Sequence, residues 1–140
     1  LSGELAPGLR AIMGYAFLDA KVTRSPSRND GQPVQGKRST LTPRHAANFW
    51  ITKDLNGGFG VGAGANLVAS RYANAGNTVR LPGYVTADAA AWWRQGPWGV
   101  QLNVYNITDA RYIVSSHGAN GNMNLPGAPR NVMLKLSYRM

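Results

Sequence analysis

Cysteine is absent from the 140 residues, and histidine occurs only twice. Without thiols the chain can form neither a disulfide framework nor a thiolate metal site, and two isolated histidines are too few to hold a metal. The sequence also lacks an apolar run of the 18 or more residues that a transmembrane helix needs, which excludes a helical membrane protein. It has no initiator methionine and no signal-like apolar segment near Leu1, so any export signal either lies upstream or does not exist.

Acidic residues are scarce, because six Asp and Glu oppose 15 Lys and Arg and leave a formal net charge of +9. This excess predicts an anionic partner such as lipopolysaccharide phosphates, an acidic ligand or nucleic acid, and charge alone does not choose among them. Glycine is frequent at 17 residues, whereas Leu and Ile are few. The composition therefore argues against a densely packed soluble core and favours a sheet with two different faces.

Residues 98–113 carry the dominant pattern of the chain, an alternation of apolar and polar side chains. The apolar ones occupy every second position, namely Trp98, Val100, Leu102 and Val104. A helix would scatter these positions around its circumference, so the period of two indicates a strand with one apolar and one polar face. The same alternation predicts six strands at residues 9–23, 40–55, 59–72, 83–95, 98–113 and 127–140, after the end of a strand in residues 1–5.

Short turns alternate with long loops along this chain. The turns fall at residues 6–8, 56–58 and 96–97, and the loops fall at residues 24–39, 73–82 and 114–126. This asymmetry predicts an all-β fold, part of a transmembrane antiparallel up-and-down β-barrel whose consecutive strands pair, with periplasmic turns and extracellular loops. About ten residues at roughly 3.3 Å each, tilted near 45°, cross roughly 25 Å of hydrocarbon. A soluble β-sandwich with an exposed polar face is the alternative.

The apolar side chains of such a barrel face lipid. The outward set is expected to include Val61, Ala65, Leu67, Leu102, Leu134 and Leu136. Trp93, Trp98 and Tyr138 lie on the same face beside the short turns, where they predict a periplasmic aromatic girdle. Residues 9–23 carry apolar side chains in both registers, so their faces stay unassigned.

Short motifs throughout the chain add a resemblance to a known family. They are Gly14-Tyr15, Asp19-Ala20-Lys21-Val22-Thr23, Pro43-Arg44-His45, Asn48-Phe49-Trp50, Leu81-Pro82-Gly83-Tyr84, Asp88, Leu102-Asn103-Val104, Asn106-Ile107-Thr108-Asp109, Tyr112 and Gly127-Ala128-Pro129-Arg130. In this order and spacing the chain resembles the last six strands of the TonB-dependent siderophore receptors of the Gram-negative outer membrane. It departs from that family in ending with Met140 where Phe is usual, and in lacking a cysteine pair in the last loop.

The resemblance implies a fold, a location and partners. Residues 1–140 would form the C-terminal segment of a 22-stranded barrel, without the plug domain and earlier strands. The expected function is import of a ferric siderophore across the cell outer membrane, powered by TonB through the missing N-terminal region. The nearest alternative is a barrel of the same architecture that only lets solutes diffuse, or that imports a non-siderophore ligand such as cobalamin or a sugar.

Three motifs suggest other chemistry, and each has a simpler interpretation. Residues 60–65 match a permissive G-x-G-x-x-A pattern, but no helix follows, so we interpret the glycines as a smooth lumen wall that a plug could approach. Residues 106–108 match a glycosylation acceptor and are expected to close a strand instead. Ser115, Ser116 and His117 are neighbours in a loop and cannot orient one another for catalysis. We therefore expect no enzyme and no cofactor.

The extracellular loops supply the candidate ligand contacts. Their basic and imidazole side chains are Arg24, Arg28, Lys37, Arg38, Arg80 and His117. These could attract an anionic ferric chelate or pair with lipopolysaccharide and outer-membrane lipid phosphates, and a merely solvated loop is the alternative. Near the turns, the inward side chains of Arg94, Lys135 and Arg139 are expected to face plug carboxylates.

A different class of function would be a small basic β-protein that binds single-stranded nucleic acid. Such a protein would place aromatic side chains on its polar, basic face, where bases could stack on them. Here Trp93, Trp98 and Tyr138 occupy the apolar face. We therefore expect no nucleic-acid partner.

Overall fold

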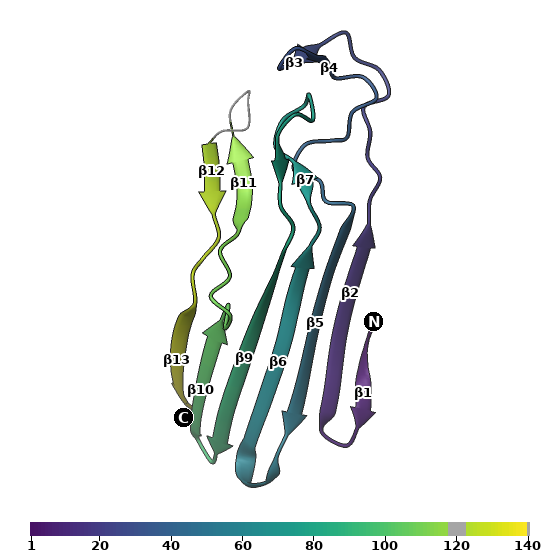
Figure 1. The fold of residues 1–140 in the computed structure, drawn as a ribbon. Coiled ribbons are helices and arrows are strands. Elements are labelled where there is room, and N and C mark those ends of the chain that lie inside the picture. The colour runs from purple at the N-terminus through teal and green to yellow at the C-terminus, as the bar shows by residue number, and fades with distance from the viewer. Residues whose placement is uncertain (118–122, 140) are drawn as a thin grey trace.

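The computed structural model describes residues 1–117 and 123–139, which form one seven-stranded antiparallel sheet (Figure 1). Its strands, in spatial order, are β1 (Ser2–Ala6), β2 (Leu9–Phe17), β5 (His45–Asp54), β6 (Phe59–Val68), β9 (Tyr84–Gln95), β10 (Trp98–Tyr105) and β13 (Asn131–Tyr138). Each strand pairs with its sequence neighbours in the sheet, which confirms the predicted topology. The end of a strand expected in residues 1–5 is the seventh strand, β1.

All three tight turns lie at one end of the sheet, and the long connections lie at the other (Figure 1). The long connections contain short hairpins, β3 (Arg28–Asn29) with β4 (Gln32–Pro33), β7 (Arg71–Tyr72) with β8 (Arg80–Leu81), and β11 (Ile113–His117) with β12 (Met123–Pro126). The loop predicted at residues 24–39 thus contains the β3–β4 pair, and a bridge between Lys21 and Arg38 closes its base.

The only helix among residues 1–117 and 123–139 is the three-residue 3₁₀ turn η1 (Asn56–Gly58). In this described part of the chain, no helix is long and apolar enough to cross a membrane. Residues 118–122 and Met140 lie outside the described residues, so the middle of the last expected loop and the last position of the terminal strand are untested.

The main strands are shorter at the loop end than the alternation predicts, and backbone geometry explains why. Strand β10 ends at Tyr105 rather than at residue 113, because Asn106 turns into the left-handed region at a φ of 50°. Strand β5 begins at His45 rather than at residue 40, because Leu41 has a φ of 55° and Pro43 lacks a backbone donor. Strand β2 ends at Phe17, and the carboxylate of Asp19 beyond it contacts Lys21, Arg38 and Arg44.

Strand register places the apolar side chains on one surface, here called the apolar face. Leu134 lies opposite Leu102, Leu102 opposite Ala91, and Ala91 opposite Val61. The register also determines the two faces of strand β2, because Met13 lies opposite Phe49 and Tyr15 lies opposite Ala47. The large side chains at odd positions of β2 therefore belong to the apolar face, and Ile12 belongs to the opposite surface, the polar face.

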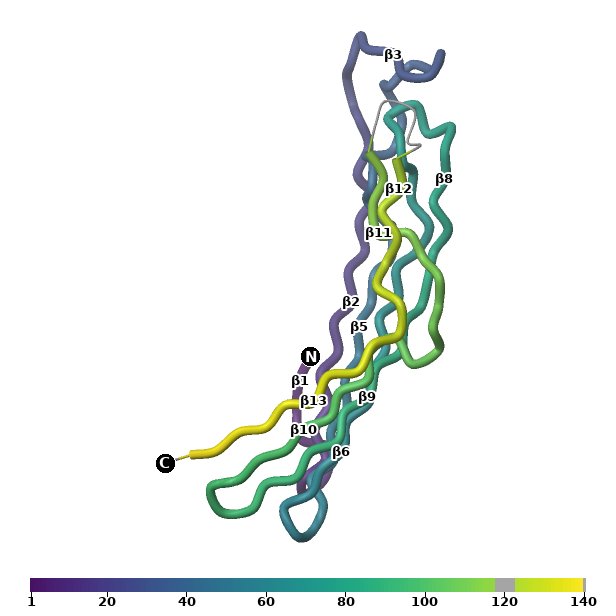
Figure 2. Tube along the Cα trace, turned by 90° about the vertical axis from the view of Figure 1, so that its left-hand side faces the viewer, coloured from purple at the N-terminus to yellow at the C-terminus, as the bar shows by residue number. Residues whose placement is uncertain are grey.

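The apolar face is uncovered in the described part of the chain. The sheet is a single layer when seen from the side (Figure 2). Leu134 is 62% exposed and Leu136 is 70% exposed, whereas the buried apolar residues are limited to Ala73, Leu81 and Ala90. A soluble β-sandwich would cover these leucines with a second sheet, so the described residues form a sheet whose apolar side needs another apolar environment.

On the polar face, two tryptophans cover the glycines of strand β6. A Cβ atom at Gly60 would overlap the indole of Trp92, and one at Gly64 would overlap the indole of Trp50. Absent side chains therefore let the indoles lie close to the backbone of the neighbouring strand. Our interpretation of these glycines as an open wall for a plug is wrong at these two positions, because indole rings fill the space.

We expect Gly64→Ala to destabilise the folded protein by about 1 to 3 kcal/mol, the usual cost of forcing extra volume into a packed site. The added methyl would overlap both the carbonyl oxygen of Phe49 and the ring of Trp50. Gly3→Ala is the matched control, because nothing lies within 4 Å of the corresponding Cβ position. A denaturant titration measures both, and equal effects at Gly3 and Gly64 would refute the packing argument.

Candidate functional site

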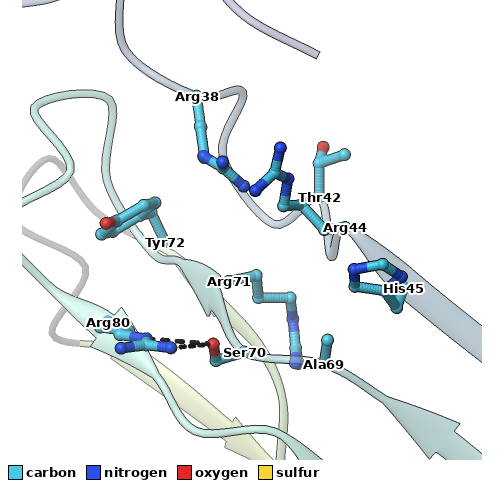
Figure 3. Close-up of a pocket in the computed structure, with 9 residues that line it drawn as sticks. All are labelled: Arg38, Thr42, Arg44, His45, Ala69, Ser70, Arg71, Tyr72 and Arg80. Atoms are coloured by element: carbon cyan, nitrogen blue, oxygen red, sulfur yellow. Dashed lines mark hydrogen bonds between the residues drawn. The ribbon is translucent and has the colours of Figure 1, made fainter. Parts of the chain in front are cut away.

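Four arginines converge at the loop end of the sheet and line one pocket, here called the four-arginine pocket (Figure 3). Its charged members are Arg38, Arg44, Arg71 and Arg80, and its other lining residues are Thr42, His45, Ala69, Ser70 and Tyr72. They come from the segment before β5, from the first residue of β5, from the two residues between β6 and β7, and from the β7–β8 hairpin. No Asp or Glu is among these lining residues, so the pocket presents only positive charge and neutral dipoles.

Backbone contacts hold these distant segments together. The backbone N–H of Arg38 donates to the side-chain oxygen of Asn77 at 2.8 Å, and the amide of Asn77 donates back to the Arg38 carbonyl at 3.0 Å. The N–H of Leu41 donates to the Tyr72 carbonyl at 2.8 Å. The segment before β5 is therefore fixed against the β7–β8 hairpin, which brings Arg38 beside residues that follow it by more than 30 positions.

Arg71 is the buried member of the pocket, with 4% of its surface exposed. Its Nη2 donates to the carbonyl oxygens of Ile113 and Val114, each at 2.7 Å, and its guanidinium lies 5.6 Å from the ring centre of Tyr84. Its Nη1 is also buried and has no hydrogen-bond partner among the described residues. Two hydrogen bonds thus fix Nη2, whereas Nη1 is a buried donor without an acceptor among the described residues.

Asp19 is the counter-ion of this region. Its carboxylate lies 3.4 Å from Nε of Arg44, 3.5 Å from Nζ of Lys21 and 3.6 Å from Nη2 of Arg38. Partial burial raises the pKa of Asp19, but the charges of Arg44, Lys21 and Arg38 and a hydrogen bond from Lys21 outweigh it, so the pKa is lowered. Asp19 stays ionised and partly neutralises two pocket arginines, whereas Arg71 and Arg80 have no carboxylate partner among the described residues.

The structure gathers two of the six residues that the sequence nominated as ligand contacts. Arg38 and Arg80 line the pocket. The other four are not among its lining residues: Arg24 and Arg28 are exposed, Lys37 is half-buried, and His117 is exposed at the end of β11.

Arg44 and Arg71 line the pocket but were not among the predicted ligand contacts. Arg44 stands in the motif Pro43-Arg44-His45, which carried part of the resemblance but no predicted role. Arg71 fell inside the predicted strand 59–72, where period two gives no reason to single it out. Charge alone was the only available signal, and it is shared by all 15 basic residues.

Aromatic side chains gather on the apolar face beside the tight turns. Trp98 and Tyr138 lie opposite each other with ring centroids 4.8 Å apart, and Trp93 pairs with Phe59 at 6.3 Å. Phe59 was not nominated for this cluster. The register places Trp93 opposite Val100, two residues farther from the turn than Trp98, so the three predicted girdle residues lie close to the same end of the sheet. Their role at a membrane boundary stays a prediction.

Asn106 closes strand β10 and is not an exposed glycan acceptor. It is 3% exposed, and its amide donates to the carbonyls of Ala110 at 3.0 Å and Ala128 at 3.1 Å. Its backbone N–H donates to the carboxylate of Asp88 at 2.8 Å. A glycan cannot be attached to a buried amide that is saturated in this way, so the strand-closing interpretation stands.

The described residues contain no cluster of three or more potential metal ligands.

Comparisons with known proteins give consistent matches. The family model described as "TonB dependent receptor-like, beta-barrel" matches residues 1–107. The chain is 30% identical over 143 residues to the ferrioxamine receptor of Yersinia enterocolitica, and this match covers 96% of this chain and 19% of that receptor. It is 31% identical over 141 residues to the catecholate siderophore receptor Fiu of Escherichia coli, covering 96% of this chain and 18% of Fiu.

Solved structures agree with these matches. The crystal structure of the siderophore receptor PiuA from Acinetobacter baumannii superposes with a TM-score of 0.86 at 26% identity, covering 98% of this chain and 20% of PiuA. The chain therefore spans about a fifth of the length of the relatives it matches. The matched proteins are receptors by name, and none of these names describes an enzyme.

Proposed function

The chain belongs to the TonB-dependent receptor family, and we propose that it forms one wall of an outer-membrane barrel that imports a ferric siderophore. The observation that carries the proposal is the agreement of fold and family, since a single-layer sheet with one apolar face matches siderophore receptors along nearly its whole length. This chain spans about a fifth of the length of its relatives, and iron import by the whole receptor requires residues outside this fifth.

The proposal assigns a place to each face and end of the sheet. The apolar face meets lipid, with Trp93, Trp98 and Tyr138, joined by Phe59, at the periplasmic boundary. The long connections are extracellular, where basic side chains can also meet lipopolysaccharide phosphates. The polar face lines the lumen of a barrel with the proposed 22 strands.

At the turn end, the polar face carries positive charge that a plug domain could pair. Lys135 lies opposite Gln101, Arg94 lies opposite Gly99, and the guanidinium of Arg94 is 5.9 Å from the ring centre of Trp92. We propose that carboxylates of a plug contact this area, and that the receptor draws energy from TonB through an N-terminal region.

Nucleic-acid binding is not our proposal. Trp50 and Trp92 lie on the polar face, opposite Gly64 and Gly60, so aromatic side chains occupy both faces of the sheet. They cover the glycines of β6, and the family match, rather than the placement of aromatics, argues for a receptor.

Uptake of radioactive iron by cells under iron limitation tests the function. Deleting the gene that encodes this chain should abolish uptake from at least one ferric siderophore, and deleting TonB should abolish the same uptake. Restoring the full-length gene is the control. Unchanged uptake from every siderophore, together with loss of cobalamin or sugar uptake, would contradict the proposal and identify a receptor for another ligand.

A further inference from the structure

The four-arginine pocket has the chemistry of an oxyanion site, and we infer that it selects ligands bearing several acidic oxygens. The inference rests on the proposed function, and it narrows the siderophore class to ferric chelates with a net negative charge. A neutral chelate of the same size would leave the pocket charge uncompensated. The ligand is a soluble anion that enters from the loop end.

Charge balance is the first argument. Four guanidinium groups line the pocket, and the nearest carboxylate, Asp19, is shared among Arg38, Arg44 and Lys21. One negative charge cannot neutralise three neighbours, and it does not reach Arg71 or Arg80 as an ion pair in the described structure. Guanidinium groups bind carboxylate, phosphate and similar oxygen pairs through two parallel hydrogen bonds, which makes arginine the residue suited to such ligands.

The free donor of Arg71 is the second and independent argument. Arg71 is only 4% exposed, and its Nη1 is buried with no acceptor in the described part of the chain. A buried donor without a partner carries a large desolvation penalty. The two carbonyl contacts of Nη2 and the ring of Tyr84 hold the guanidinium in place, so a ligand oxygen would meet a donor that is already oriented.

The position of Arg71 favours a soluble ligand over a lipid headgroup. Its guanidinium lies over Tyr84, and Tyr84 shares the polar face of β9 with Thr86 and Asp88. Arg44 lies instead over Phe17 of the apolar face, at 5.8 Å from the ring centre. Lipopolysaccharide phosphate is therefore the competing source of oxyanions, and the experiment must separate the two sources.

Binding measurements on the full-length receptor in lipopolysaccharide-free detergent test the inference. The probes are a hexadentate tris-catecholate chelate of ferric iron, which is trianionic, and a hexadentate tris-hydroxamate chelate, which is neutral. We expect the trianionic chelate to bind at least about tenfold more tightly. We expect Arg80→Gln and Arg71→Gln each to weaken its binding by about tenfold, the loss typical of one charge-assisted hydrogen bond.

Arg28→Gln is the matched control, because Arg28 is exposed, lies outside the pocket and changes the net charge equally. Arg80 is exposed, and its guanidinium donates to the Ser70 hydroxyl, so Arg80→Gln is expected to fold. This variant therefore still tests the inference if Arg71→Gln fails to fold. Equal affinities for the two chelates, or equal losses in Arg28→Gln and Arg80→Gln, would overturn the inference.

Two further measurements distinguish lipopolysaccharide from a soluble chelate as the source of the oxyanion, and distinguish failure of the inference from failure of the proposed function. In vesicles that contain lipopolysaccharide, a pocket variant that changes retention of lipopolysaccharide but not chelate binding would overturn the soluble-ligand assignment. Binding of the neutral chelate alone would overturn the inference and leave the proposed function standing. If neither chelate binds, the proposed function fails for these ligands, and binding of inorganic pyrophosphate tests the pocket by itself. Pyrophosphate binding that is weakened by Arg80→Gln but not by Arg28→Gln supports an oxyanion site. Absence of pyrophosphate binding overturns the inference.

Discussion

Replacing Leu134 by arginine should destabilise the membrane-embedded protein by about 2 to 4 kcal/mol, the cost of a cation at the lipid-facing midplane of a barrel. Leu134 lies in the middle of β13, opposite Leu102 on the apolar face, and it is 62% exposed in the sheet. Because the described residues leave most of Leu134 uncovered, the arginine would meet hydrocarbon. Denaturant titration of the full-length receptor in lipid vesicles measures the loss.

Met133→Arg is the control for that substitution. Met133 is the next residue of the same strand, lies at the same depth and faces Asn103 on the polar side. A cation there stays in an aqueous lumen, so we expect a much smaller loss. Similar losses at Leu134 and Met133 would mean that the faces are reversed or that no lipid contacts the sheet.

The isolated 140-residue chain should fail to form a stable monomer in detergent or lipid. Strands β1 and β13 are the two edges of the sheet, and each pairs with one neighbour among the described strands. An edge in hydrocarbon leaves backbone N–H and C=O groups unsatisfied at several kcal/mol each, which membranes do not tolerate. Edges that lack a partner pair with other copies, so oligomers or aggregates are the expected product.

Mass measurement in detergent and amide exchange test this expectation together. Fast exchange along β1 and β13, with a mass above that of one chain, would agree with open edges. A stable monomer of 15.0 kDa whose edge amides exchange slowly would contradict the account. The comparison chain is the full-length receptor, in which both edges should be protected.

Sheet topology was predictable because local chemistry determines it. Period-two alternation identifies a strand and its faces without knowledge of the partner strand, as residues 98–104 illustrate. Pro and Gly at residues 7–8 and 96–97 identify tight turns, and Gly8 and Gly96 adopt positive φ there. Consecutive antiparallel pairing follows once the turns are short.

The four-arginine pocket was not predictable because its members are joined by long-range contacts. Two hydrogen bonds between Arg38 and Asn77, and one from the Leu41 N–H to the Tyr72 carbonyl, hold the segment of Arg38 beside the β7–β8 hairpin, and no local pattern encodes them. The same limit applied to Trp50 and Trp92, whose positions over the β6 glycines depend on strand register. Strand ends were also misplaced, because side-chain contacts such as those of Asn106 compete with the ladder.

Site-directed spin labelling along β10 tests most directly the central claim, that one face of this sheet contacts lipid. These 140 residues contain no cysteine, so single cysteines can be introduced at successive positions from 98 to 105, and no native cysteine of this segment has to be replaced first. The account predicts that labels at Val100, Leu102 and Val104 are accessible to oxygen dissolved in lipid, and that labels at Gln101 and Asn103 are accessible to a water-soluble paramagnetic reagent. Uniform accessibility, or the opposite alternation, would contradict it.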